Sequence, residues 1–245
     1  MRKSWDDIHF NTKLKIYPRG MLKETVCSKA IFKEPGWEED KKEPPKKIGK
    51  PKNMSKEVRE DSVKRAKEAI FDIATLNEFT HFVTWTLNKE FIDRYDTNAV
   101  RRKLRIFLDD MKKRNGLVYL IIAELHKDGA IHLHGLIKGK IELKDSGHKT
   151  KDGKAVYNMP QWKIGYSTAI ELTGERNIVA KYITKYVSKN FRKIFGSFYY
   201  AGGKGIKRKP PIRLYNKNYE DVNTKEYFIP KAGIGFKYQN YEVKL

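Results

Sequence analysis

The sequence predicts an α+β domain with a central antiparallel sheet and helices packed on one face. Apolar residues recur at helical spacing in three segments, and β-branched or aromatic runs of strand length lie between them. The turn sequence "HKDGA", residues 126–130, directly joins two such runs, which predicts a hairpin and therefore antiparallel strands. With helices on one face, the other face of the sheet is expected to stay free for a bound molecule.

The expected order is helix, strand, helix, three strands and a final helix. Ser55 is expected to cap the first helix, which runs to about Leu76. Asp96 or Thr97 caps the second helix, and Gly116 ends it because glycine tolerates the left-handed conformation found after helix C-termini. The other expected elements are strands at 80–87, 117–125, from 130 onward and at 166–172, a loop or irregular hairpin at 139–160, and a helix over about 175–190.

Composition divides the chain into three segments. Residues 1–54 form an N-terminal arm that ends in the Lys/Pro-rich linker "KKEPPKKIGKPKN", and residues 55–194 form the central domain. Residues 195–245 form a basic C-terminal extension that contains half of the fourteen tyrosines. Aromatic side chains among lysines are suited to stacking on bases, but strands that complete a core are at least as good an interpretation of this extension.

The charge balance predicts a polyanionic partner. The 52 Lys and Arg residues exceed the 30 Asp and Glu residues, for a net charge of +22. Nucleic acid is the first candidate and an anionic membrane surface the second. No apolar run approaches the ~20 residues of a membrane span, and the single cysteine, Cys27, excludes intrachain disulfides. The expected location is the cytoplasm, without a membrane partner.

The segment "AIHLHGLIKGK", residues 130–140, places two histidines on one face of a strand. A three-residue loop after His126 would put Glu124 opposite His132 and next to His134, on the same face. A two-residue turn would shift the register and move Glu124 to the other face. Two imidazoles and one carboxylate suit a divalent ion such as Mg²⁺ or Mn²⁺ that holds a phosphate. The alternative is a hydrogen-bonded or solvent-facing histidine pair.

The segment "NIVAKYITKYVSKN", residues 177–190, places two tyrosines one helical turn apart. Tyr182 and Tyr186 share a helix face, and Lys185 and Lys189 each follow a tyrosine by three positions. A phenol becomes a competent nucleophile when a neighbouring ammonium or a metal-polarised phosphate favours the phenolate. Lys185 is therefore a candidate catalytic residue beside the tyrosines, and Lys181 and Lys189 are candidates for DNA binding. The alternative is that both tyrosines lie at the rim of a core.

Three motifs in order resemble those of the HUH endonucleases, above all the rolling-circle replication initiators of small phages and plasmids. They are "FVTWTL" (82–87), "IAELHKDGAIHLHGLI" (122–137) and "YITKYVSK" (182–189). The resemblance implies an HUH/RRM-like nicking domain in which His132, His134 and Glu124 bind a divalent ion and Tyr182 and Tyr186 are nucleophiles. It further implies nicking and rejoining of single-stranded or hairpin DNA at a replication origin through a 5′-phosphotyrosine. No phosphate-binding G-x-x-x-x-G-K-[ST] motif is present, so a host helicase and polymerase are the expected partners.

Other functions fit part of the pattern. A non-catalytic nucleic-acid-binding protein accounts for the charge but leaves the paired tyrosines unexplained. A single-strand transposase or a mobilisation relaxase uses the same chemistry, although relaxases more often have three clustered histidines. An iron oxygenase with two histidines and one carboxylate fits the ligands but neither the charge nor the Tyr/Lys helix.

Overall fold

The computed structural model describes residues 8–34, 59–174, 176–190 and 193–242. The chain forms two compact units. The central unit comprises residues 57–209, and the terminal unit combines residues 1–56 with residues 210–245. In the described residues, no helix combines the length and the apolar character needed to cross a membrane.

A seven-stranded antiparallel sheet forms the centre of the central unit. Its strand order is β11-β6-β7-β5-β10-β9-β8. The strands are β5 (His81–Leu87), β6 (Val118–Leu125), β7 (Ile131–Lys138), β8 (Lys144–Lys149), β9 (Ala155–Asn158), β10 (Gly165–Glu171) and β11 (Tyr200–Gly202). The helices are α2 (Glu60–Leu76), α3 (Thr97–Asn115) and α4 (Arg176–Asn190).

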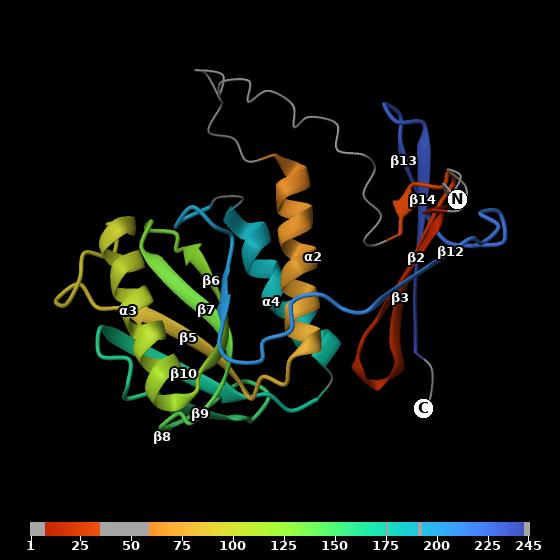
Figure 1. The fold of residues 1–245 in the computed structure, drawn as a ribbon. Coiled ribbons are helices and arrows are strands. Elements are labelled where there is room, and N and C mark those ends of the chain that lie inside the picture. Colours follow the sequence, from red (N-terminus) through yellow and green to blue (C-terminus); the bar gives the residue numbers. More distant parts are fainter. Residues whose placement is uncertain (1–7, 35–58, 175, 191–192, 243–245) are drawn as a thin grey trace, which may run out of the picture. The chain divides into compact units, whose positions relative to one another are not determined.

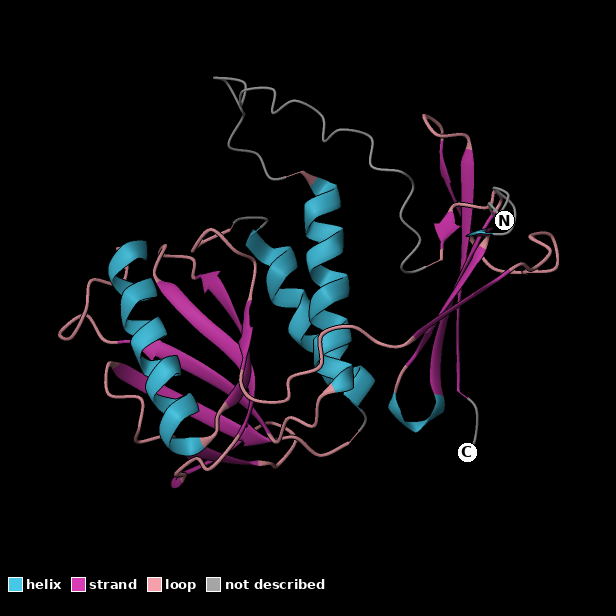
Figure 2. Ribbon diagram, in the orientation of Figure 1, coloured by secondary structure: helices cyan, strands magenta, loops and turns pink. Residues whose placement is uncertain are grey.

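The α+β class is confirmed, but helices pack against both faces of the sheet and not against one as predicted (Figures 1 and 2). Helix α3 buries Leu104 against Trp85 and Leu133 on one face. Helices α2 and α4 bury Ile70 and Ile183 against the other face. The physical reason is the nearly continuous apolar sequence of β6, because a strand that is apolar at successive positions must be covered on both sides.

Most expected elements are present with small shifts at their ends. The side chain of Asp96 caps α3 by accepting hydrogen bonds from the N–H groups of Asn98 and Ala99. Gly116 ends α3 in the left-handed conformation, with φ = 62°. The polar segment forms the hairpin β8–β9, whose register shifts between Asp145 and His148. Helix α2 begins at Glu60, and Ser55 lies outside the described residues.

In the terminal unit, segments from the two ends of the chain form one sheet, although the sequence predicted an N-terminal arm and a separate C-terminal extension. The five strands have the order β12-β2-β3-β14-β13. They are β2 (Thr12–Ile16), β3 (Met21–Cys27), β12 (Ile212–Tyr215), β13 (Glu226–Ile229) and β14 (Ile234–Glu242). A short pair, β1 (His9–Phe10) with β4 (Phe32–Lys33), and the 3-10 helix η1 (Pro18–Gly20) complete the described part of this unit.

Residues 195–209, expected in the C-terminal extension, belong to the central unit. Strand β11 in this segment pairs with β6 and extends the seven-stranded sheet. Of the two interpretations of the extension, the structure therefore favours strands that complete folded units. Pairing between residues that are far apart in the chain has no local signature, which explains why the segment boundaries differ from those predicted.

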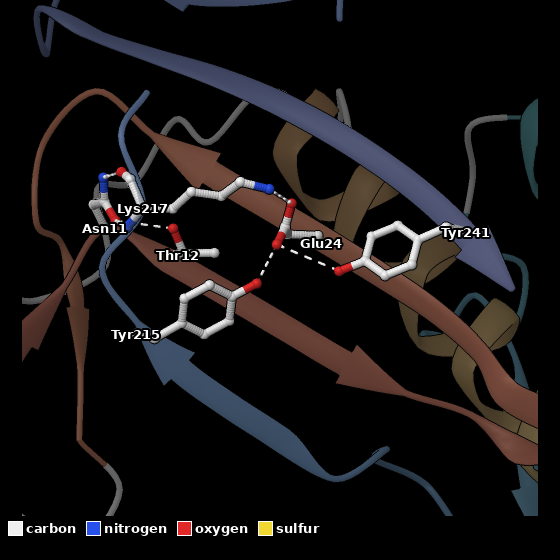
Figure 3. A network of polar contacts seen from close by, with 6 residues as sticks. All are labelled: Asn11, Thr12, Glu24, Tyr215, Lys217 and Tyr241. Carbon is white, nitrogen blue, oxygen red and sulfur yellow. Dashed lines mark hydrogen bonds and ion pairs between the residues drawn. The ribbon is translucent and has the colours of Figure 1, made fainter. Parts of the chain in front are cut away.

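A buried carboxylate lies at the centre of the terminal sheet (Figure 3). The Glu24 side chain in β3 is only 1% exposed. It accepts hydrogen bonds from the hydroxyls of Tyr215 and Tyr241 and pairs with the Lys217 ammonium at 3.0 Å. Next to this network, the Asn11 amide donates to the Lys217 carbonyl at 2.7 Å. These contacts join the N-terminal and C-terminal segments within one sheet.

Gly135 in β7 allows β6 to approach closely. A Cβ atom at this position would overlap the Cδ1 atom of Ile121 and lie 2.9 Å from the Leu120 carbonyl oxygen. We expect Gly135→Ala to lower the free energy of unfolding by about 1–3 kcal/mol, as overpacked cores do. Urea unfolding followed by the fluorescence of Trp85 and Trp162 measures this change. The control is Thr168→Ala at an exposed position of β10, and an equally small effect in both variants would contradict the prediction.

Candidate active site

The hairpin between β6 and β7 has the predicted three-residue loop. The His126 N–H donates to the Ala130 carbonyl at 2.8 Å, and Gly129 has the left-handed φ of 85°. Glu124 therefore lies opposite His132 in the antiparallel pair. The predicted register is confirmed, and Glu124, His132 and His134 share one face of the sheet.

Neighbouring strands extend this face into three rows. The first row is Tyr166, Thr86, His132 and Glu124; the second is Thr168, Thr84, His134 and Ile122; the third is Ile170, Phe82, Leu136 and Leu120. The third row includes the most buried residues, because Leu120 and Leu136 pack in the cluster with α2 and α4. The first row is more accessible, with Tyr166 69% exposed at its end. The face thus changes from apolar under the helices to polar beyond them.

Hydrogen bonds orient the His134 ring. Its Nε2 atom lies 2.9 Å from Oε2 of Glu124, and its Nδ1 atom lies 3.2 Å from the Thr84 hydroxyl. The His134 and Glu124 side chains are only 11% and 13% exposed. An ion pair or hydrogen bond at such a position is shielded from water, so it restrains both side chains more strongly than a surface contact.

His132 occupies a different environment. Its ring stacks on that of His126, with the centroids 4.7 Å apart. Burial lowers the pKa of His132, and the nearby charge of His126 lowers it further. The neutral imidazole is therefore favoured, and this is the form that can coordinate a metal ion.

Helix α4 places the two tyrosines against the second and third rows. The Tyr186 ring stacks on His134, with the centroids 3.9 Å apart, and is 8% exposed. Tyr182, one turn earlier, is 44% exposed, and its hydroxyl lies 2.9 Å from the Tyr186 hydroxyl. Burial raises the pKa of Tyr186, and the hydrogen bond with Tyr182 raises it further. The two phenols are thus adjacent but differ in access: one is open to a ligand and one is enclosed.

The three candidate lysines lie on the same helix. The Lys185 ammonium is 5.7 Å from the centroid of the Tyr182 ring. Lys181 is exposed one position before Tyr182. The side chain of Lys189 lies outside the described residues.

Comparison with known protein families adds an independent observation. Residues 80–191 match a family of replication-associated proteins, those of the ORF2 type. The matched region runs from β5 to α4 and includes the rows of the sheet face and both tyrosines. No curated protein and no solved structure gave a match.

Within the region that matches the replication-associated proteins, the structure adds site residues that the sequence analysis missed. The Phe82 ring in β5 lies 5.4 Å from the Tyr182 ring and 6.2 Å from both the Tyr186 and His134 rings, between centroids. Thr84 bonds to His134, and Tyr166 ends the row that contains His132. The signal available in the sequence was the alternation in β5 and β10. It assigns residues to faces but does not say that these strands lie beside β7.

The donor types in the matched region fit a divalent ion. Among the described residues, no three His, Cys, Asp or Glu side chains already converge as a formed metal site requires. His134 and Glu124 are nevertheless joined through one hydrogen bond, and metal ligands exchange such protons for the ion when it binds. Two imidazoles and one carboxylate also leave coordination positions open for phosphate oxygens. Coordination by all three requires His132 to leave its stacked position on His126.

Proposed function

We propose that this protein is a replication initiator that nicks and rejoins single-stranded DNA at an origin through a 5′-phosphotyrosine intermediate. The principal observation is the pair of tyrosine hydroxyls 2.9 Å apart beside the His134–Glu124 pair. The match to replication-associated proteins and the net charge of +22 support a DNA substrate. A single-strand transposase or relaxase would use the same residues and chemistry.

In the proposed reaction, the Tyr182 oxygen attacks a phosphodiester phosphorus as its own proton is lost. A bond forms between this oxygen and phosphorus, the bond from phosphorus to the 3′ oxygen breaks, and the 3′ oxygen leaves as a hydroxyl after taking up a proton. The Lys185 ammonium beside the Tyr182 ring stabilises the negative charge that develops on the phenol. Because one phosphate ester is exchanged for another, attack by a 3′-hydroxyl on the phosphotyrosine rejoins the strand.

We further propose that His132, His134 and Glu124 hold the divalent ion, Mg²⁺ or Mn²⁺. When bound, such an ion orients the scissile phosphate and offsets its charge. Thr84 holds the His134 ring in place for this role.

Metal binding can be tested without DNA. We expect Glu124→Gln to weaken Mn²⁺ binding by at least about 10-fold, because the anionic ligand is lost. Isothermal titration calorimetry with Mn²⁺ measures the affinity. The matched control is Glu142→Gln at a position with an exposed side chain, and equal affinities for both variants and the wild type would place the ion elsewhere.

A covalent adduct is the decisive test of the proposed function. The protein is incubated with Mn²⁺ and labelled single-stranded oligonucleotides that tile the genetic element encoding it, and the products are separated on a denaturing gel. We expect a labelled species at protein mass that is absent from the double variant Tyr182→Phe/Tyr186→Phe. Cleavage without this species would identify water as the nucleophile. Tight binding without cleavage or adduct would favour the non-catalytic nucleic-acid-binding protein.

A further inference from the structure

A cavity of about 450 Å³ opens beside Tyr182, outside the row that contains His132. Its apolar lining includes Phe82 and Ile170 from the third row of the sheet face and Val179 from α4. The Tyr182 ring forms part of its wall. This volume is within the range of pockets that bind small molecules.

Two charged residues of opposite sign line the same cavity. Asp152 and Lys154 belong to the turn between β8 and β9, and both are exposed to solvent. A pocket for phosphate alone would not include a carboxylate, because like charges repel. A carboxylate and an ammonium together match a flat polar edge that has both hydrogen-bond donors and acceptors, as nucleobases do.

The position of the cavity points to a base of the DNA that is cut. If Tyr182 attacks the scissile phosphate, a nucleotide next to that phosphate lies within reach of the cavity that Tyr182 lines. Single-stranded nucleic acids are recognised through unstacked bases that pack on aromatic and apolar side chains and present their edges to polar groups. Phe82, Ile170 and Val179 offer such packing, and Asp152 offers an acceptor for an exocyclic amine.

We propose that this cavity, the base pocket, receives one unstacked base with an exocyclic amino group from the strand that Tyr182 attacks. The pocket would thereby select which phosphodiester is cut. The inference rests on the proposed function for its link to cleavage, but binding of the base is measurable without cleavage.

Cytosine and uracil provide a matched pair of probes, because cytosine has an amino group where uracil has a carbonyl oxygen. The full chain is titrated with labelled homopolymers of dC and dU of equal length, in EDTA and at mildly alkaline pH, and fluorescence anisotropy gives the affinities. We expect wild-type protein to bind dC about 10-fold more tightly than dU. The variant Asp152→Asn should bring this ratio close to one. The control Asp145→Asn, which makes the same charge change elsewhere on the β8–β9 hairpin, should preserve it.

A second variant tests the cavity itself. Val179→Trp fills the space without changing charge and should lower dC affinity to that of dU, whereas Ile106→Trp at an exposed position of α3 should not. Equal wild-type affinities, or a ratio unchanged in both pocket variants, would overturn the base pocket. An adduct on the tiled oligonucleotides without this discrimination overturns the base pocket alone. Discrimination that depends on Asp152 without any adduct overturns the link to cleavage and the proposed function.

Discussion

Tyr182→Phe is expected to lower the initial rate of DNA adduct formation by about 10³-fold or more, as the loss of a nucleophile does in other enzymes. Tyr182 is the accessible member of the tyrosine pair, at 44% exposure, whereas Tyr186 is 8% exposed and stacked on His134. A phosphate can reach the Tyr182 hydroxyl without displacing the helix. Tyr186→Phe should lower the same rate by only about 5–10-fold, because it removes one hydrogen bond from the attacking hydroxyl.

The measurement is the rate of appearance of labelled protein on a denaturing gel, with one cleavable oligonucleotide and Mn²⁺. Tyr166→Phe is the matched control, since it removes a hydroxyl from the same sheet face and keeps the ring. Its rate should equal that of the wild type. Full activity in Tyr182→Phe together with loss in Tyr186→Phe would reverse the assignment and make the enclosed tyrosine the first nucleophile.

Glu24→Ala is expected to destabilise the terminal unit by about 3 kcal/mol. The substitution removes the acceptor of the Tyr215 and Tyr241 hydroxyls and the partner of the Lys217 ammonium. Buried donors that lose their acceptor cost about 1–3 kcal/mol each when no water replaces it, although part of this cost is relieved here because Lys217 is 34% exposed. Hydrogen exchange of the β3 amides, followed by mass spectrometry, measures the opening free energy of this sheet directly.

The control for this prediction is Glu242→Ala, which removes an exposed carboxylate from β14 of the same sheet. It should change the opening free energy of β3 by less than about 0.5 kcal/mol. Glu24→Gln should lie between the two, since its amide oxygen still accepts from a tyrosine hydroxyl but has no charge for Lys217. Equal exchange rates in Glu24→Ala and Glu242→Ala would show that the buried network does not stabilise the sheet.

Local sequence patterns were sufficient for the parts of the site that are close in the chain. The side chain of Asp128 accepts the Ala130 N–H at 3.0 Å, and Gly129 supplies the left-handed residue, so the loop itself sets the register of Glu124 and His132. Helical periodicity likewise brings the Tyr182 and Tyr186 hydroxyls together. Both arrangements depend on backbone geometry within a few residues.

Contacts across strands that are distant in the chain required the tertiary structure. Strand β5 lies between β7 and β10, and this order places Thr84 against His134 and Tyr166 in the row of His132. The prediction of helices on one face failed for a related reason: the apolar pattern of β6 indicates burial but does not say which helix covers which side.

The sequence by itself therefore determined the α+β class, the hairpin register and the candidate histidines, carboxylate and tyrosines, because turn chemistry and the periods of strands and helices act over a few residues. Only the tertiary structure decided the strand order, the different exposure of Tyr182 and Tyr186, the cavity beside Tyr182 and the pairing of the two chain ends in the terminal sheet. These features arise from packing between segments that are far apart in the chain. Many pairings of such segments bury similar apolar surface, so the local pattern does not select among them.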